Sequence, residues 1–518
     1  MKKILYISII SLAALLTACD EWLSILPKNE QVTPDYWKSK EDVEAVLAAG
    51  YLYMTEATPV IISWSEARAS SVYPWTTTDK QAQQKLQDFQ LTADSKLCQW
   101  APFYKIINMA NSVIKYAPEV YSIDETYNFG AMQSHQSEAY FMRGLIYFYL
   151  VRNFGAVPLV LDPYVDDSAP FTIAKSEESV IIEQIKQDMR TALSTGSAKE
   201  QFENDRWLGA SKGRATKWAL YALMSDVSLW SEDYDACITY ADSLINATAT
   251  WRPIFMSVSD QWFTIFNPGN SNESIFELNW DYATTGKTTG SPSTVFNWNT
   301  TTSGTPAYDF TPTMTAKLLE EKALATVAGK ISVRAEFGNY WSPDGITAET
   351  QSVGIWKYVG GQTKQANDLR VRLDANYIIY RMADIMLMKA EALVWKGANG
   401  WQESLDIINK IRQRAQVPDL NINVVETNEL EMLTAVLDER NMELAAEGKR
   451  WYDLMRFGRS KNYKYQQDFI NTIVEYNTSA NDTWIRSVLA NHDAWYLPIS
   501  EAEIEVNDLL VQNPYYGK

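Results

Sequence analysis

The segment RATKWALYALMSDVSLW, residues 214–230, gives the clearest indication of the fold. Ala215, Trp218, Ala219 and Ala222 lie on one stripe at helical spacing, and small residues there allow a second helix to approach closely. After a short polar turn, another helical pattern begins at Tyr234. The segment therefore predicts two antiparallel helices joined by a tight turn.

A similar pair of helical patterns recurs over residues 380–415. Ala383, Leu387 and Ala390 form the stripe of the first helix, and apolar residues such as Ile408 follow at the same spacing in the second. Such pairs resemble tetratricopeptide units, but they are unevenly spaced. We expect scattered helix-turn-helix pairs inside one domain rather than a regular solenoid.

Helical patterns extend over about 39–245 and 376–460, and they predict the scaffold of the protein. Ser39 and Asp42 are spaced as a capping box at the start of the first helix. Residues 138–153 are apolar on nearly every side, which predicts a buried helix that ends at Gly155.

Between about 246 and 375 the helical periodicity largely fails. Residues 274–280 alternate like a strand, and residues 281–310 are rich in Thr, Ser, Gly and Asn. A long polar loop inside a compact domain is usually functional. We therefore expect a mostly α-helical domain over residues 39–518, with an irregular ligand-face insert that contains minor β structure and a C-terminal segment at 461–518.

The N-terminus has the pattern of a lipoprotein signal peptide. Lys2 and Lys3 precede an apolar run at 4–16, which is shorter than the roughly 20 residues that span a bilayer. The run ends in Leu16-Thr17-Ala18-Cys19, which is similar to a lipobox. We expect removal of residues 1–18, acylation of Cys19 and a tether over 19–38.

Acylation determines how this chain would meet a membrane. Two or three acyl chains on Cys19 give stable anchoring where one chain would not. No later segment reads as a membrane span. We expect membrane contact through the lipid anchor only.

Composition excludes one class of partner. The chain carries a formal net charge of −18, and removal of Lys2 and Lys3 takes it to −20. An acidic surface repels phosphate backbones, so no nucleic-acid partner is expected. Cys98 and Cys237 are expected to be free buried thiols, although export would permit a disulfide.

Catalytic chemistry finds little support in the sequence. His135 and His492 have no nucleophile or metal-ligand spacing beside them, so both are interpreted as surface or satisfied core residues. No phosphate-binding loop, paired-Cys zinc pattern or nucleophile elbow is present. The sequence predicts no catalytic residue, no metal site and no cofactor, while bound calcium is left open.

One charged cluster allows two interpretations. Glu439, Glu443 and Glu447 share a helical face at i, i+4 and i+8, and further charges follow at Arg440, Lys449, Arg450, Asp453 and Arg456. The cluster could be an active site or anion clamp. We favour a partly buried ion-pair network, with Arg412 and Arg414 as partners that relieve the mild repulsion between the like charges.

Aromatic residues exceed what a helical core requires, with 19 Trp, 29 Tyr and 17 Phe. Several lie among small polar residues, where no core is expected. Flat rings in such loops can stack on a ligand, and a guanidinium can donate hydrogen bonds to it. The candidate ligand-binding residues are Trp75, Trp280, Tyr282, Trp298, Tyr308 and Arg68. The alternative is that the rings anchor their loops onto the scaffold.

Several segments together resemble the SusD/RagB family of surface lipoproteins. The similarity covers the chain from the lipobox almost to Lys518. The motifs that carry it are EAYFMR at 138–143 with FGAVPL at 154–159, GRAT at 213–216, YRMAD at 380–384 with AEA at 390–392, EGKRWYDL at 447–454, LPISEAEI at 497–504 and QNP at 512–514.

The resemblance implies a mostly α SusD-like fold displayed on the outside of the outer membrane, above a SusC-like TonB-dependent barrel. Family members capture oligosaccharides or polysaccharides and deliver them to the barrel, and some carry peptides. A glycan-binding lid is thus our first hypothesis, a peptide-binding lid the second and a surface hydrolase the third. Residues 67–70, Ala-Arg-Ala-Ser, depart from the family's usual Arg-Ser-Asp-like pattern, which puts an inherited acidic contact there in doubt.

Overall fold

The structure is a computed structural model, and it describes residues 36–74, 80–164, 172–202, 212–282, 286–296, 308–338, 355–361, 370–479 and 481–517. The predicted signal peptide at 1–18, Cys19 and most of the predicted tether at 19–38 lie outside these residues, so those expectations stay predictions. The protein is mostly α-helical, as expected.

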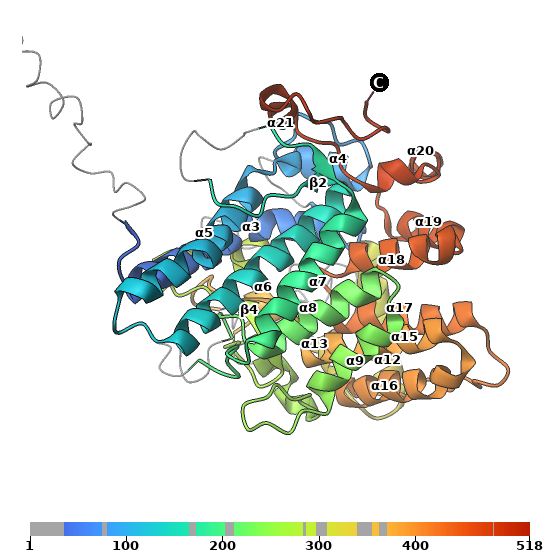
Figure 1. The fold of residues 1–518 in the computed structure, drawn as a ribbon. Coiled ribbons are helices and arrows are strands. Elements are labelled where there is room, and N and C mark those ends of the chain that lie inside the picture. The colour runs from blue at the N-terminus through green and yellow to red at the C-terminus, as the bar shows by residue number, and fades with distance from the viewer. Residues whose placement is uncertain are drawn as a thin grey trace, which may run out of the picture.

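The N-terminal half is an array of helices in which each packs on the next (Figure 1). Its members are α3 (Lys40–Ile62), α5 (Ala101–Ile123), α6 (Phe129–Phe154), α7 (Glu178–Ser194), α8 (Lys217–Trp230) and α9 (Tyr234–Ile245). Every residue from 141 to 154 of α6 is buried, as its apolar pattern predicted, and the helix ends at Gly155, which has a φ of +69°.

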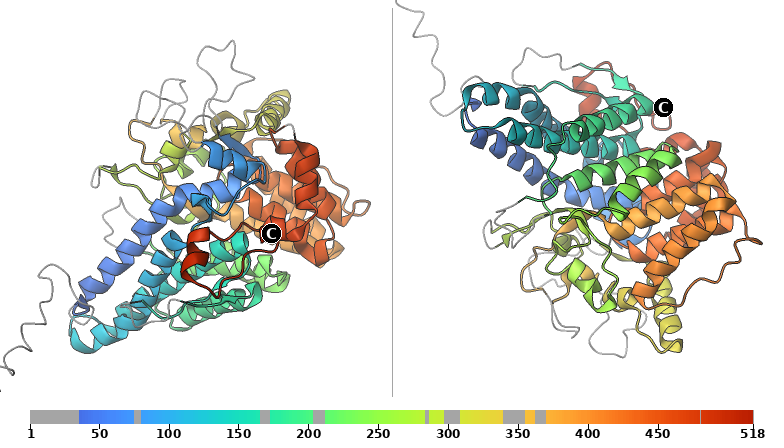
Figure 2. Two further views of the ribbon diagram at one scale, coloured as in Figure 1. Left: turned by 90° about the horizontal axis from the view of Figure 1, so that it is seen from above. Right: turned by 60° about the horizontal axis from the view of Figure 1, so that its bottom comes forward.

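The array continues into the C-terminal half, because α15 packs on α9 (Figure 1). Beyond it come α16, α17, α18 and α19, and the C-terminal helices lie along one side of the molecule (Figure 2). The bounds are α15 (Met382–Lys396), α16 (Trp401–Ala415), α17 (Glu429–Glu443), α18 (Arg450–Tyr463), α19 (Gln466–Tyr476), α20 (Asp482–Leu489) and α21 (Glu501–Val506).

Both predicted helix pairs are confirmed. The α8 and α9 pair is joined by a short turn, and the Asp233 carboxylate caps α9 by accepting from the Ala236 N–H. The second pair is α15 and α16, although the first helix begins only at Met382. Tyr380 and Arg381 belong instead to strand β6 (Tyr377–Arg381), which is buried on both faces.

The first helix begins as its sequence predicted. Ser39 and Asp42 form a reciprocal capping box at the start of α3. The helix continues as a π-helical turn, η1 (Ser63–Ala67), and every residue from 61 to 72 is buried. Lys40–Ala67 is long and apolar enough to cross a membrane, contrary to our expectation for later segments. It packs against α5 and α6 inside the helix array.

The insert at 246–375 contains short strands, as expected, and more helix than expected. Strand β4 (Ser274–Leu278) pairs antiparallel with β6, and β5 (Tyr308–Phe310) pairs with β1 (Val72–Pro74). Helix α12 (Pro312–Val327) was missed from the sequence. The remaining short elements are α11 (Pro292–Val295), α13 (Val333–Gly338), α14 (Trp356–Val359), η3 (Ser259–Ile265), η4 (Ala398–Gly400), η5 (His492–Trp495), and β2 (Val157–Pro158) paired with β3 (Lys175–Ser176).

Candidate functional site

A cleft of about 430 Å³ opens where the C-terminal end of α3 meets α4 (Lys80–Gln87), the segment 92–97 and strand β5. Such a volume is within the usual range for a small-molecule site. Its lining combines apolar and polar side chains from segments far apart in sequence. They are Pro59, Val60, Ser63, Gln81, Ala82, Gln83, Lys85, Thr92, Asp94, Ser95, Lys96, Leu97, Val295 and Tyr308.

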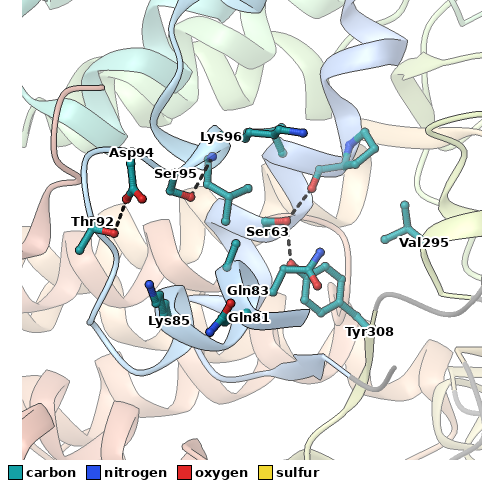
Figure 3. A pocket seen from close by; sticks show the side chains of 14 residues that line it. Ser63, Gln81, Gln83, Lys85, Thr92, Asp94, Ser95, Lys96, Val295 and Tyr308 are labelled. Atoms are coloured by element: carbon teal, nitrogen blue, oxygen red, sulfur yellow. Dashed lines mark hydrogen bonds between the residues drawn. The ribbon is translucent and has the colours of Figure 1, made fainter. Parts of the chain in front are cut away.

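Ser63 and Tyr308 fix one wall of the cleft (Figure 3). The Tyr308 hydroxyl donates to Ser63 Oγ at 2.7 Å, and Ser63 Oγ donates to the Pro59 carbonyl oxygen at 2.8 Å. Both Tyr308 and Ser63 are buried. This chain of hydrogen bonds joins β5 to the end of α3 and leaves the wall rigid.

Gly290 brings α11 close to α3, so that Val295 reaches the cleft. Its φ is +84°, and a Cβ there would lie 2.7 Å from the Thr55 carbonyl oxygen. Thr55 lies one turn before Pro59, which has no N–H to donate to that oxygen. Glycine is therefore the residue that fits both the backbone conformation and the close approach.

The opposite wall is polar and exposed to solvent. It carries the amides of Gln81 and Gln83 and the ammonium groups of Lys85 and Lys96. The Thr92 hydroxyl donates to the Asp94 carboxylate, and this hydrogen bond holds the pKa of Asp94 below its usual range (Figure 3). The wall thus presents both donors and acceptors beside an apolar floor.

The predicted aromatic residues differ in their exposure to solvent. Trp280 is 7% exposed, and its indole N–H donates to the Thr289 carbonyl oxygen at 3.0 Å. Tyr308 is 1% exposed, whereas Tyr282 is 43% exposed with the Arg372 guanidinium 5.7 Å from its ring. Trp75 and Trp298 lie outside the described residues. The expectation of exposed stacking faces is therefore wrong for Trp280 and Tyr308, because Tyr308 lies in strand β5 and Trp280 two residues beyond strand β4, where both side chains are buried.

Arg68 is also buried and does not face the cleft. Its guanidinium donates to the Trp495 carbonyl oxygen at 2.5 Å and lies 4.1 Å from the centre of the Trp451 ring. Burial lowers its pKa to about 10. The expectation of a ligand contact at Arg68 is wrong, because the side chain joins the end of α3 to the C-terminal segment.

The polar wall of the cleft was not predicted from the sequence. Residues 80–87, KQAQQKLQ, form a short and strongly polar helix. Their composition is typical of a helix on the solvated surface and does not indicate a binding site. Only the pairing of β1 with β5 brings the neighbouring segments together. A run of Gln and Lys side chains close to Trp75 in the sequence was the one available signal.

The charged cluster is a buried network, as we favoured. Glu443 receives hydrogen bonds from Arg381 at 2.7 Å and from Arg414 at 2.6 Å, and Arg334 approaches it at 3.4 Å. Burial by itself would raise the pKa of Glu443, but Arg414, Arg381 and Arg334 lower it to about 2. Arg414 was an expected partner, and it is confirmed.

The other members of the cluster pair in the same way. Glu439 binds Arg334 at 2.6 Å and the expected partner Arg412 at 3.3 Å. Glu447 receives hydrogen bonds from Arg381 and Lys357. Further pairs join Arg440 and Lys449 to Asp384, Arg440 and Arg456 to Asp453, and Arg456 to Glu391. Arg450 differs, because it donates to the Leu437 carbonyl oxygen at 3.0 Å.

The histidines and cysteines have structural surroundings. His135 is buried and shares a 2.8 Å hydrogen bond with the Tyr127 hydroxyl, while burial and nearby cations lower its pKa to about 3. His492 stacks on Tyr463. Cys98 and Cys237 are free and buried, as expected. Within the described part of the chain, no group of three His, Cys, Asp or Glu side chains is arranged to hold a metal ion.

Comparison with known proteins agrees with this architecture. The profile of the SusD family matches residues 221–516, and a profile described as "Starch-binding associating with outer membrane" matches residues 21–229. The chain is 26% identical to SusD-like protein P38 of Formosa agariphila, over 89% of this chain and 93% of that protein. It is also 26% identical to a SusD-like protein of Bacteroides ovatus, over 90% and 85%.

Solved structures share the fold. A SusD superfamily protein of Bacteroides vulgatus superposes with a TM-score of 0.73 at 22% identity, over 92% of this chain and 99% of that one. A structure titled "Laminarin binding SusD-like protein" superposes with a TM-score of 0.63 at 20% identity, over 93% and 100%. The two profiles together span the described helices and the insert, and on this evidence the chain belongs to the SusD family.

Proposed function

We propose that this chain is a surface lipoprotein of the outer membrane that binds oligosaccharides or polysaccharides and delivers them to a SusC-like TonB-dependent barrel. The observation that carries the binding proposal is the cleft between α4 and β5, where amides and ammonium groups face an apolar floor. Membership of the SusD family supports the same function.

The lining of the cleft suits the chemistry of a sugar. A sugar ring has hydroxyl groups at its edge, and they exchange hydrogen bonds with amide, hydroxyl and ammonium groups. Its C–H faces pack on apolar surface, which Val60, Ala82 and Val295 provide. Once the entropy of binding is subtracted, such contacts give affinities of about micromolar to millimolar. Weak binding suits a protein that releases its cargo.

Hydrolysis is a weaker proposal for the same cleft. A glycosidase uses two carboxyl groups roughly 5–10 Å apart, one of which carries a proton. Among the described residues that line the cleft, Asp94 is the only acidic one, and its lowered pKa keeps it ionised near neutral pH. A binding function accounts for the lining without a second carboxylate.

The binding proposal is tested by affinity electrophoresis of the protein lacking residues 1–19 through gels that contain single polysaccharides, laminarin among them. Laminarin enters the panel because a structural neighbour is described as binding it. Lys85→Ala and Gln83→Ala should weaken the retardation about two- to tenfold, as expected for one lost hydrogen bond. Lys330→Ala, an exposed lysine outside the cleft lining, is the control.

A peptide mixture is screened in parallel, by mass spectrometry of what the protein retains. Retained peptides with no retarded polysaccharide would replace the glycan proposal with the peptide-binding alternative. Release of reducing sugar from any polymer in the panel would instead favour the hydrolase.

The anchor and the barrel are tested in cells. Cys19→Ala should leave the protein unlipidated, which detergent partitioning and mass spectrometry of the mature N-terminus measure. Purification of the wild-type protein from native membranes in mild detergent should recover a large barrel protein with it. Recovery of a lone lipoprotein would count against delivery to a barrel.

A further inference from the structure

A second cleft, of about 400 Å³, lies between α20, residues 89–91 and the turn at the C-terminus. Trp484, Tyr515 and Tyr516 line it, together with the buried Phe89 and the exposed side chains of Asn481 and Gln90. Trp484 is 38% exposed, so part of its ring faces solvent. A partly exposed tryptophan beside two tyrosines offers aromatic faces to a ligand.

The three rings are held in position. The Trp484 indole N–H donates to the Asp88 carbonyl oxygen at 3.0 Å, and α20 is anchored by the buried side chains of Ile485, Val488 and Leu489. Tyr515 and Tyr516 meet edge to face, with ring centres 4.9 Å apart. Rings that are already ordered lose little entropy when a ligand binds.

The C-terminal turn that carries the tyrosines is fixed by Asn513. Its side-chain oxygen accepts from the Tyr515 N–H at 3.0 Å, and its amide nitrogen donates to the Asp493 carbonyl oxygen at 2.9 Å. Tyr516 N–H donates to the Asn513 carbonyl oxygen at 2.9 Å. The turn is therefore bonded both internally and to the body of the protein.

Phe89 fixes the third side of the cleft. It has a φ of +55°, a left-handed conformation that a bulky side chain adopts at some cost. The Gln90 N–H donates to the Lys85 carbonyl oxygen at 2.8 Å, which closes the end of α4. The Phe89 ring is buried against Trp451 and holds this turn in place, so that Gln90 is presented at the cleft.

The chemistry of the lining selects a neutral, hydroxylated ligand. None of the described residues that line this cleft carries a carboxylate, ammonium or guanidinium group. Burial raises the pKa of Tyr516 to about 12, so its hydroxyl stays protonated at neutral pH. Aromatic faces pack on the C–H face of a sugar ring, and the amides of Asn481 and Gln90 can serve its hydroxyls.

One stretch of the chain contributes to both clefts. Gln83, Lys85 and Thr92 line the first cleft, whereas residues 89–91, which lie between Lys85 and Thr92 in the sequence, line the second. We propose that the cleft of Trp484, Tyr515 and Tyr516 is a second sugar-binding subsite, which takes another neutral segment of the polysaccharide held in the first. This inference rests on the proposed glycan-binding function.

Two subsites on one polymer raise its apparent affinity, since the second contact forms at high effective concentration. Loss of one stacked and partly buried ring should therefore raise the apparent dissociation constant for the polymer about five- to thirtyfold. A tri- or tetrasaccharide that occupies only the first cleft should not be affected.

The test is affinity electrophoresis of wild type and variants in the same polysaccharide panel, with titration of the matching short oligosaccharide. Trp484→Ala and Tyr515→Ala should weaken polymer retardation by this factor. Trp484→Phe, which keeps a ring, should restore part of it. Trp251→Ala is the control, because this tryptophan is 57% exposed and lines neither cleft. Asn481→Ala is a third variant at the second cleft. The Asn481 side chain is exposed and makes no helix-capping hydrogen bond, so the substitution removes no cap from α20.

The outcomes separate this inference from the function on which it rests. If the wild type is retarded and all three alanine variants at the second cleft match it, the second subsite is refuted and the glycan-binding function stands. If no polysaccharide retards the wild type, both are refuted. Melting temperatures within about 2 °C of wild type are required of each variant, and Asn481→Ala and Tyr515→Ala decide the matter if Trp484→Ala unfolds.

Discussion

Arg381 Nη1 donates to Glu443 Oε1 at 2.7 Å, and both side chains are at most 1% exposed. Arg381 ends strand β6, whereas Glu443 ends helix α17, so the pair joins this strand to the helical scaffold. Arg381 also donates to Glu273 Oε1 at 2.9 Å. Glu273 lies in the insert, just before β4. The network thus holds together the insert, strand β6 and helix α17. The helical periodicity of the sequence alone did not indicate these contacts.

Glu443→Ala should lower the free energy of unfolding by about 3–5 kcal/mol, because it leaves the guanidinium groups of Arg381 and Arg414 buried with less compensation. Denaturant unfolding measures the change. Glu183→Ala is the matched control, since Glu183 pairs with Arg190 at 2.6 Å on the exposed surface and should contribute at most about 1 kcal/mol. Unchanged stability together with lost glycan binding would identify the cluster as an anion clamp instead.

Glu66→Gln should change how stability depends on pH. Burial raises the pKa of Glu66 to about 7, although it accepts hydrogen bonds from the Lys449 and Gly448 N–H groups. Below pH 4.5 the carboxyl is protonated in both the folded and the unfolded chain. Between about pH 4.5 and pH 7 the carboxyl is ionised in the unfolded chain but still protonated in the folded chain. The free energy of unfolding therefore falls as the pH rises through this range.

The glutamine variant should lack this loss, which for a shift of this size amounts to about 3 kcal/mol. Urea unfolding of both proteins from pH 4.5 to 8 measures it as the difference between the two curves. The difference isolates Glu66, because Glu277, whose pKa burial also raises to about 7, is present in both. Parallel curves over this range would show that Glu66 titrates normally.

The helix pairs could be predicted from the sequence because their contacts are local and their stripes are apolar. Ala219 and Ala222 lie at the helix contact that their spacing predicted. Helix α12 escaped detection because its buried face includes Thr315 and Glu321, and Glu321 is buried only through its ion pair with Arg334. A charge that is buried by pairing with a distant residue interrupts the periodicity on which sequence prediction rests.

The candidate site was harder to predict, since it depends on contacts between distant segments. Tyr308 lies in a stretch of small polar residues, yet its hydroxyl bonds to Ser63 and its strand pairs with residues 72–74. No local pattern in the sequence indicates that pairing. The polar wall at 80–87 has the composition of any solvated helix, so its position beside Tyr308 could be learned only from the fold.

Cys98 and Cys237 should react with a thiol reagent only after unfolding. Burial raises the pKa of each thiol to about 12, which leaves almost no thiolate at neutral pH. Titration of the protein lacking residues 1–19 with an aromatic disulfide reagent should detect no fast-reacting thiol in buffer and two in denaturant. A fast-reacting thiol in buffer would show that one of the two sites opens to solvent.

Single alanine substitutions should separate the aromatic residues that hold the fold from those that hold a ligand. Trp280→Ala and Tyr308→Ala should each lower the free energy of unfolding by about 3–5 kcal/mol, because each removes a buried ring and leaves a cavity. Tyr308→Phe should cost only about 1 kcal/mol, since Ser63 keeps its hydrogen bond to Pro59. Tyr282→Ala, at an exposed ring, should change stability by no more than about 0.5 kcal/mol.

Loss of binding affinity should affect other variants than loss of stability does. Trp75→Ala and Trp298→Ala stay our predicted stacking variants, and each should weaken polysaccharide binding by about 1–3 kcal/mol without a change in melting temperature. Titration calorimetry and thermal unfolding of the same preparations measure both quantities. If Trp75→Ala and Trp298→Ala lose stability and keep their affinity, those rings anchor their own segments and do not stack on the sugar.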